Sequence, residues 1–181
     1  MGMTTITISG TPGSGKSTVA QLLHERLNLP YVYSGLIFRE AAQKHGMSLE
    51  EFSRHCETQS DIDRELDDRQ IELLRQGNLI LEGRLAGWLA HRHHIPAFKI
   101  MLDAESTLRA QRIVNREQGD VEERKREMLQ REQSERKRYE TYYGIDLLDT
   151  SIYDLVIDTS NKTPEVIVDM IMQRLKETHY L

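Results

Sequence analysis

The feature that most constrains this chain is the run SGTPGSGKST at residues 9–18, which contains the spacing G-x-x-x-x-G-K-[ST]. It follows the apolar run TTITIS at residues 4–9 and precedes a segment whose apolar residues recur three and four positions apart. A strand that enters a glycine-rich turn and then a helix lets successive backbone N–H groups point at phosphate oxygens. The run therefore predicts a phosphate-binding loop in an α/β fold.

The side chains of this loop predict a nucleoside triphosphate and a metal ion. Lys16 is expected to reach the β and γ phosphates and to act in catalysis, and the Ser17 hydroxyl is expected to ligate Mg²⁺. The residues we assign to the triphosphate are Gly10, Thr11, Pro12, Gly13, Ser14, Gly15, Lys16, Ser17 and Thr18. A chance glycine-rich turn is the alternative, but both flanking elements that the motif requires are present.

A second metal ligand is expected at the end of another apolar run. Glu82 ends the run NLILE, where a carboxylate would hold Mg²⁺ through water. Alternatively, Glu82 is simply the first polar residue after a strand. Asp103 and Asp158 end two further apolar runs and compete for this role, although we interpret them as caps of the helices that follow. We therefore assign Ser17 and Glu82 to the metal.

Five short apolar runs alternate with helical segments along the chain. They are rich in Ile, Val, Leu and Tyr and are continuous rather than alternating, as in strands buried on both faces of a parallel sheet. The runs cover residues 4–9, 31–34, 78–82, 98–103 and 153–158. We predict one P-loop NTPase domain over residues 1–181, an α/β fold with a five-stranded parallel sheet flanked by helices.

Two connections are longer than a minimal crossover between parallel strands. The first covers about residues 35–77, within which Ser48 followed by Glu51 predicts a capping box at a helix start. The second is dense in arginine and covers about residues 112–143. We expect both to be helical excursions from the sheet.

Composition excludes several classes of protein. The 181 residues suffice for one domain, and the formal net charge of −5 argues against a general binder of nucleic acids or membranes. The lone Cys56 cannot form an intrachain disulfide, so we expect a buried thiol in a reducing compartment. No stretch approaches the roughly 20 apolar residues of a membrane span, and the first ten residues lack the pattern of a signal peptide. We expect a cytoplasmic protein, with a monomer as the default.

The residues near the strand ends indicate the chemistry of the acceptor. A kinase that acts on an alcohol needs a carboxylate to take the hydroxyl proton, whereas one that acts on a phosphate needs cations to bring two polyanions together. Arg39 in SGLIFR and Arg84 in LEGR each follow a strand, and neither lies in a run of alternating charge. A solvated helix face therefore explains them less well than binding of an acceptor phosphate.

Four segments resemble the nucleoside monophosphate kinase family. SGLIFR at 34–39 resembles its Ser/Thr-Gly-x-x-x-Arg motif, and EGR at 82–84 resembles the Asp-Gly-Arg of cytidylate kinases. RIVNR at 112–116 is similar to the lid-flanking R-I-x-x-R, and REQSERKR at 131–138 is similar to the segment R-D-x-x-D-R-x-R. The resemblance spans the chain in the right order and is nearest to the archaeal type of cytidylate kinase.

This resemblance implies a reaction and a set of roles. The reaction is phosphoryl transfer from ATP to CMP or dCMP, with small nucleotides as the partners, an NMP-binding insertion at about 35–77 and a short lid at about 112–143. Arg112 would cover the adenine. The residues implied for the acceptor are Ser34, Gly35, Arg39, Gly83 and Arg84, and those implied for the transferring phosphoryl group are Arg116, Arg131 and Arg138. Leu85 and Glu135 depart from the bacterial pattern, which has Asp at both positions.

Alternatives remain open at this point. The acceptor could be AMP, UMP or a small metabolite, or the chain could be a P-loop ATPase without an acceptor. The arginines of the second excursion share helix faces, yet pairs such as Glu127 with Arg131 would equally suit a solvated, salt-bridged helix. Asp63, with Asp67, Arg64 and Arg69, is a candidate for reading the acceptor base, although a polar helix face explains these residues too.

Overall fold

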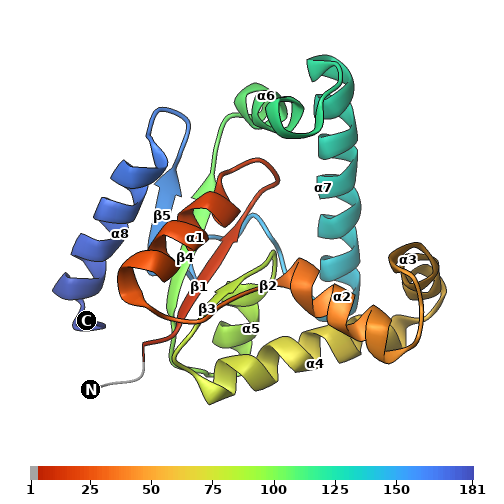
Figure 1. Ribbon diagram of the computed structural model, residues 1–181, viewed down its shortest axis with the longest axis horizontal. Helices are drawn as coiled ribbons and strands as arrows, with labels where there is room; N and C mark the ends of the chain where they lie inside the picture. The colour runs from red at the N-terminus through yellow and green to blue at the C-terminus, as the bar shows by residue number, and fades with distance from the viewer. Residues whose placement is uncertain (1–3) are drawn as a thin grey trace.

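The computed structural model describes residues 4–181, apart from the side chains at positions 50, 53 and 57. Residues 1–3, which begin the stretch tested above for a signal peptide, lie outside the described residues. The strands are β1 (Ile6–Gly10), β2 (Tyr31–Tyr33), β3 (Ile80–Glu82), β4 (Phe98–Asp103) and β5 (Leu155–Asp158). They pair in parallel in the order β2-β3-β1-β4-β5 (Figure 1). The predicted five-stranded parallel sheet is confirmed.

Burial follows each strand's place in the sheet. Every residue of β1 and β3 is buried, as the continuous apolar runs predict. In β4 full burial alternates with partial burial, and in the edge strand β5 only Ile157 is fully buried while Val156 is half exposed. Every residue of the edge strand β2 is half-buried. Continuous burial is therefore correct for β1 and β3 and wrong for β2, β4 and β5.

Helices cover both faces of the sheet. On one face α1 (Lys16–Leu27) and α8 (Pro164–Glu177) lie side by side (Figure 1). Their buried residues, together with those of β1, β4 and β5, form one core that includes Val19, Leu23, Ile167 and Ile171. On the other face α5 (Ala86–Arg92) packs with residues of α4 and β3 in a second core. The phosphate loop thus joins a fully buried strand to a firmly packed helix.

The first excursion is a three-helix unit with its own small core. It consists of α2 (Ser34–Lys44), α3 (Leu49–Thr58) and α4 (Ser60–Gln76). The core includes Ala41, Ala42, Phe52 and Ile62. The capping box of Ser48 and Glu51 is confirmed at the start of α3, because each side chain accepts a hydrogen bond from the backbone of the other.

The second excursion consists of α6 (Ser106–Glu117) and the long α7 (Val121–Tyr143). Met128 is the one fully buried residue of α7. In Figure 1 α7 descends from α6 toward α2 and α3, so the two excursions face each other. The described residues include no helix that is long and apolar enough to cross a membrane.

Two predicted helix caps are wrong. The cap of α6 is Glu105, whose side chain accepts from the Leu108 N–H, and the cap of α8 is Thr163. Asp103 and Asp158 end their strands, and short loops separate them from the helices. Asp103 instead accepts hydrogen bonds from the Thr11 hydroxyl and the Ala104 N–H, which ties β4 to the phosphate loop.

Candidate active site

The glycines of the phosphate loop occupy positions where a residue with a Cβ would be strained or would clash. Gly13 and Gly15 have φ values of 74° and 94°, in the region that disfavours residues with a Cβ. A Cβ at Gly10 would lie 2.4 Å from the carbonyl oxygen of Leu102, and one at Gly13 would lie 2.6 Å from that of Arg109. The loop is therefore pressed against β4 and α6, and it leads directly into the first turn of α1.

Ser17 and Glu82, the two residues that the sequence assigns to the metal, come together at the carboxyl-terminal end of the sheet. The Ser17 hydroxyl lies 3.1 Å from one carboxylate oxygen of Glu82, and the Tyr31 hydroxyl donates to the other. A hydroxyl and a carboxylate are the oxygen ligands that suit Mg²⁺, which commonly takes few protein ligands beside substrate phosphates. No group of three or more His, Cys, Asp or Glu side chains among the described residues forms a competing metal site.

Lys16 lies among charges of both signs. Its ammonium group donates to the Thr11 carbonyl over 3.0 Å. Burial, together with the positive charge of Arg84, lowers the pKa of Lys16 to about 8, while the carboxylates of Glu82 and Glu135 oppose the shift. Negative charge brought between Lys16 and Arg84 would therefore relieve a repulsion that the protein itself maintains.

Arg84 is held by α7. Its Nη2 lies 3.1 Å from Oε2 of Glu135, and both side chains are largely buried. Neither atom makes a hydrogen bond, so the pair attracts by charge without good donor geometry. Arg131 donates to the other oxygen of Glu135 over 3.0 Å. Glu135 thus binds two arginines that the sequence assigns to substrate, one from the turn after β3 and one from α7.

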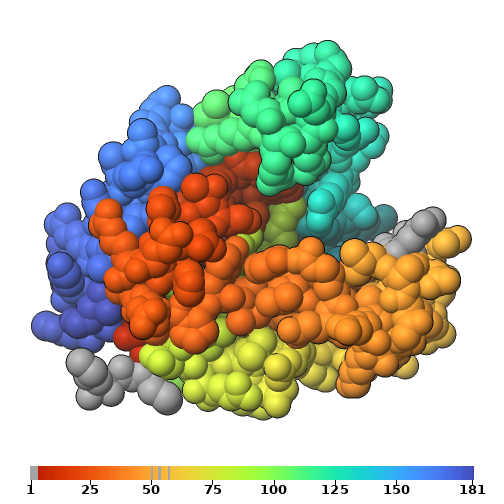
Figure 2. All heavy atoms as spheres, in the orientation of Figure 1, coloured from red at the N-terminus to blue at the C-terminus, as the bar shows by residue number. Residues whose placement is uncertain are grey.

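These groups line a cavity of about 650 Å³ between the two excursions. Figure 2 shows the surface hollowed between α7, in teal, and α2, in orange. Predicted site residues in its lining are Ser34, Gly35, Asp63, Arg84, Arg131 and Arg138. The Arg138 guanidinium lies over the Tyr139 ring, 5.0 Å from its centre. The cavity is cationic where it borders β3 and α7, and it has carboxylates and apolar groups along α4.

Two predicted arginines lie elsewhere. Arg39 is exposed, with its guanidinium 5.4 Å from the centre of the Tyr33 ring and bonded to the Tyr33 hydroxyl, and it is not part of the cavity lining. Arg116 is exposed at the end of α6 and pairs with Glu117. Their assigned roles therefore require movement, and they stay predictions.

Arg112 lies beside the phosphate loop, on the side assigned to the triphosphate. Its guanidinium donates to the Gly13 carbonyl over 3.2 Å, and to the Thr159 hydroxyl and carbonyl over 3.0 and 2.8 Å. The Thr159 hydroxyl in turn donates to the Ser14 carbonyl. Arg112 thus joins α6, the loop after β5 and the phosphate loop, and its contact with the adenine stays a prediction.

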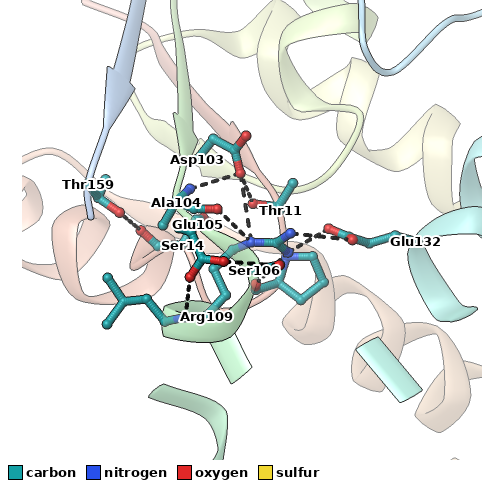
Figure 3. Close-up of polar contacts among 12 residues, drawn as sticks. Thr11, Ser14, Asp103, Ala104, Glu105, Ser106, Arg109, Glu132 and Thr159 are labelled. Carbon is teal, nitrogen blue, oxygen red and sulfur yellow. Dashed lines mark hydrogen bonds and ion pairs between the residues drawn. The ribbon is translucent and has the colours of Figure 1, made fainter. Parts of the chain in front are cut away.

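Arg109 is a buried residue of the site to which the sequence assigns no role. It is 6% exposed. Its guanidinium donates to the carbonyls of Ala104 and Pro12, over 2.9 and 3.3 Å, and to the Glu132 carboxylate over 2.6 Å. Figure 3 shows it between the phosphate loop, Asp103 and α7. The one signal in the sequence was its position three residues before Arg112 on the same helix face. The exposed Arg116 has the same kind of spacing, so spacing alone does not show which of the two is buried.

Other outcomes concern α7 and α3. The solvated-helix interpretation is correct for most of α7, yet Glu132 and Glu135 form buried pairs with Arg109 and Arg84.

The expectation that Cys56 is buried is wrong, because this free thiol is half-buried and lines the cavity. Asp67, which the sequence offers as a base-reading candidate beside Asp63, also lines the cavity.

Strand order, phosphate loop and cationic cavity together define the class of protein as a kinase of the P-loop NTPase fold. The shikimate kinase of Bacteroides thetaiotaomicron shares this fold, with a TM-score of 0.64, 16% identity and coverage of 99% of this chain and 100% of that one. The chain belongs to the cytidylate kinase-like family, whose sequence profile matches residues 5–161.

Archaeal relatives match most of the chain. The cytidylate kinase of Pyrococcus horikoshii is 49% identical over 160 residues, which are 88% of this chain and 82% of the relative. That of Methanocaldococcus jannaschii is 47% identical over 167 residues, which are 92% and 94% of the two chains. The resemblance to the archaeal type that the motifs indicate is confirmed.

Proposed function

We propose that this protein transfers the γ-phosphoryl group of ATP to CMP or dCMP, which yields CDP or dCDP and ADP. The observation that carries the proposal is the largely buried Arg84, which lines the cavity, lies near Lys16 and forms an ion pair with Glu135 of the lid helix. A cation in that position suits an acceptor that is itself a phosphate. Family membership and relatives named cytidylate kinase support the choice of base.

The donor half of the site would bind ATP. Backbone N–H groups of the phosphate loop would cradle the phosphates, Lys16 would reach the β and γ phosphates, and Arg112 would lie against the nucleotide. Ser17 and Glu82 would hold Mg²⁺, which neutralises charge on the phosphates when it is bound. These side chains act by position and charge, since phosphoryl transfer requires little covalent chemistry from the protein.

The acceptor half would bind the monophosphate. Arg84 would hold its phosphate, with Arg39 joining it from α2, and Arg131, Arg138 and Arg116 would stabilise the transferring group. An acceptor oxygen then attacks the γ-phosphorus in line, a bond to that oxygen forms, and the bond from the γ-phosphorus to the bridging oxygen of ADP breaks. No general base is required, because the attacking oxygen is already anionic.

Both excursions would close over the substrates. Residues of about 35–77 form the acceptor side and those of about 112–143 form the lid, and their closure would exclude water that otherwise hydrolyses ATP. We further propose that the protein acts as a cytoplasmic monomer on small nucleotides, without nucleic-acid or membrane partners.

An assay of ADP release across CMP, dCMP, UMP and AMP tests the proposal. CMP or dCMP should stimulate ADP release most. Preference for AMP or UMP would move the assignment to another acceptor, and no stimulation by any monophosphate would favour a P-loop ATPase without an acceptor.

Substitution of Arg84 tests which half of the site it serves. Arg84→Ala should lower kcat/KM for the acceptor by roughly 10²–10³-fold, while the KM for ATP changes little. The matched control is Arg26→Ala, because Arg26 forms an exposed pair with Asp169 on the helices of the other face. Equal losses for ATP and acceptor would contradict the assignment.

A further inference from the structure

Gln70 presents an unpaired carbonyl oxygen at the acceptor cavity. The residue lies on α4, is 6% exposed, and lines the cavity. Its side-chain oxygen Oε1 is buried and has no hydrogen-bond partner. Buried polar groups in native proteins are nearly always satisfied, so each exception calls for an explanation. A ligand that donates a hydrogen bond is one explanation.

Two neighbours fix the orientation of this amide. The Gln70 amino group Nε2 faces Oδ1 of Asp67 at 3.5 Å, and the Tyr143 hydroxyl donates to Oδ2 of the same carboxylate. Burial raises the pKa of Asp67 to about 6, so near neutral pH this side chain is ionised and can only accept. The amide therefore keeps its NH₂ toward Asp67 and its oxygen away from it.

The oxygen lies close to Gly83, the residue that directly precedes the acceptor arginine. A Cβ at Gly83 would lie 3.3 Å from Gln70 Oε1 and 3.4 Å from Ser34 Cβ. Gly83 directly precedes Arg84, and Ser34, Gln70 and Arg84 all line the cavity. A side chain at position 83 would crowd Oε1, so the glycine keeps this unpaired oxygen free of a Cβ contact, next to the cation that we assign to the acceptor phosphate.

We propose that Gln70 Oε1 accepts a hydrogen bond from the exocyclic amino group of the acceptor base, with Asp67 and Tyr143 as positioning residues. This inference rests on the proposed function and names the residue that selects the base. Cytosine carries an amino group, N4–H₂, where uracil carries the acceptor O4. An oriented carbonyl would bind the first and repel the second. The neighbouring Leu85 is apolar and buried, so it supplies no carboxylate for this task.

The test is the ratio of kcat/KM for CMP to that for UMP. Gln70→Leu removes the acceptor at similar size and should lower this ratio roughly tenfold to a hundredfold. Asp67→Asn lets the amide rotate and should lower it less, and Tyr143→Phe should lower it least. The KM for ATP should stay unchanged in all three, which a general loss of structure would not allow.

Asp68→Asn is the matched control. Asp68 is adjacent in sequence to Asp67 but is exposed and lines a neighbouring groove between α2 and α4 rather than the acceptor cavity, so the ratio should not change. If Gln70→Leu fails to fold, the ratio of kcat/KM for CMP to that for UMP in Asp67→Asn and Tyr143→Phe still tests the inference.

Three results are distinguishable. An unchanged ratio in folded variants would mean that Gln70 only holds buried water or structure, and the inference would be overturned. A wild-type preference for UMP over CMP would overturn it as well. No stimulation of the wild type by any monophosphate would instead overturn the proposed function.

Discussion

The two halves of the site differ in how their polar groups are satisfied. On the donor side, Arg109 and Arg112 donate to backbone carbonyls, and Lys16 donates to the Thr11 carbonyl. On the acceptor side, buried atoms of Arg84, Glu135 and Gln70 make no hydrogen bonds. The chain thus organises its phosphate loop by itself, whereas the acceptor cavity retains binding capacity for a ligand.

The contrast has one exception on the donor side. The Ser14 hydroxyl is buried in the phosphate loop and also has no hydrogen-bond partner. Preorganisation nevertheless remains the main property of the donor half, because its cations have fixed partners. The following predictions are ordered from the largest expected effect to the smallest, and each would break or sharpen this comparison.

Lys16 should show the largest effect, since no other described cation lies in the phosphate loop itself. Lys16→Met should lower kcat by roughly 10³-fold with CMP as acceptor, because a preorganised charge at the transferring group is lost. Steady-state ADP release measures this, with Lys125→Met on α7 as the control. A loss below tenfold would show that the donor half does not depend on this charge.

Substitutions of Arg131 and Arg136 test whether α7 takes part in catalysis or is only a solvated helix. Arg131→Ala should lower kcat by roughly 10²-fold or more, because this guanidinium lies at the cavity beside Glu135. Arg136→Ala should leave kcat nearly unchanged, since Arg136 instead lies 3.8 Å from Asp146. Equal and small effects in single-turnover measurements would favour the solvated helix.

Substitutions of Glu132 and Glu135 compare the donor and acceptor halves through their effects on the free energy of unfolding. Glu132→Gln removes the charged partner of the buried Arg109 and should lower the free energy of unfolding by about 1–3 kcal/mol. Glu135→Gln should cost less, because water in the cavity can reach Arg84, and its main effect should be on the KM for CMP. Urea denaturation and steady-state kinetics measure the two quantities. The reverse order of stabilities would contradict the comparison.

Lys16 should also make ATP binding depend on pH. Its pKa in the free protein is about 8, lowered from 10.5, so the ammonium loses its proton as the pH rises through about 8. Bound phosphates favour the charged form, and ATP binding above that pH must therefore take up a proton. The KM for ATP should rise with pH above about 8, by up to about tenfold per pH unit. A KM that stays flat to pH 10 would contradict the shift.

Local patterns were sufficient for much of the fold. The glycine spacing of the loop, the five apolar runs and the pairing of Ser48 with Glu51 each depend on residues a few positions apart, where backbone periodicity dictates the outcome. Ser17 and Glu82 come together because β1 and β3 are parallel neighbours, so the loop after β1 and the end of β3 lie on the same side of the sheet. The prediction that Asp103 and Asp158 cap the following helices was wrong because the residue that ends a strand does not show how many loop residues precede the helix.

The sequence by itself thus determined the phosphate loop, the sheet and the arginines available for an acceptor. Only the tertiary structure decided how these arginines are paired, and it revealed Arg109 and Gln70. Arg109 reaches Pro12 across 97 positions of sequence, and Tyr143 reaches Asp67 across 76. Such contacts depend on where separate helices pack, and burial rather than spacing then decides which polar atoms are satisfied and which are left for a ligand.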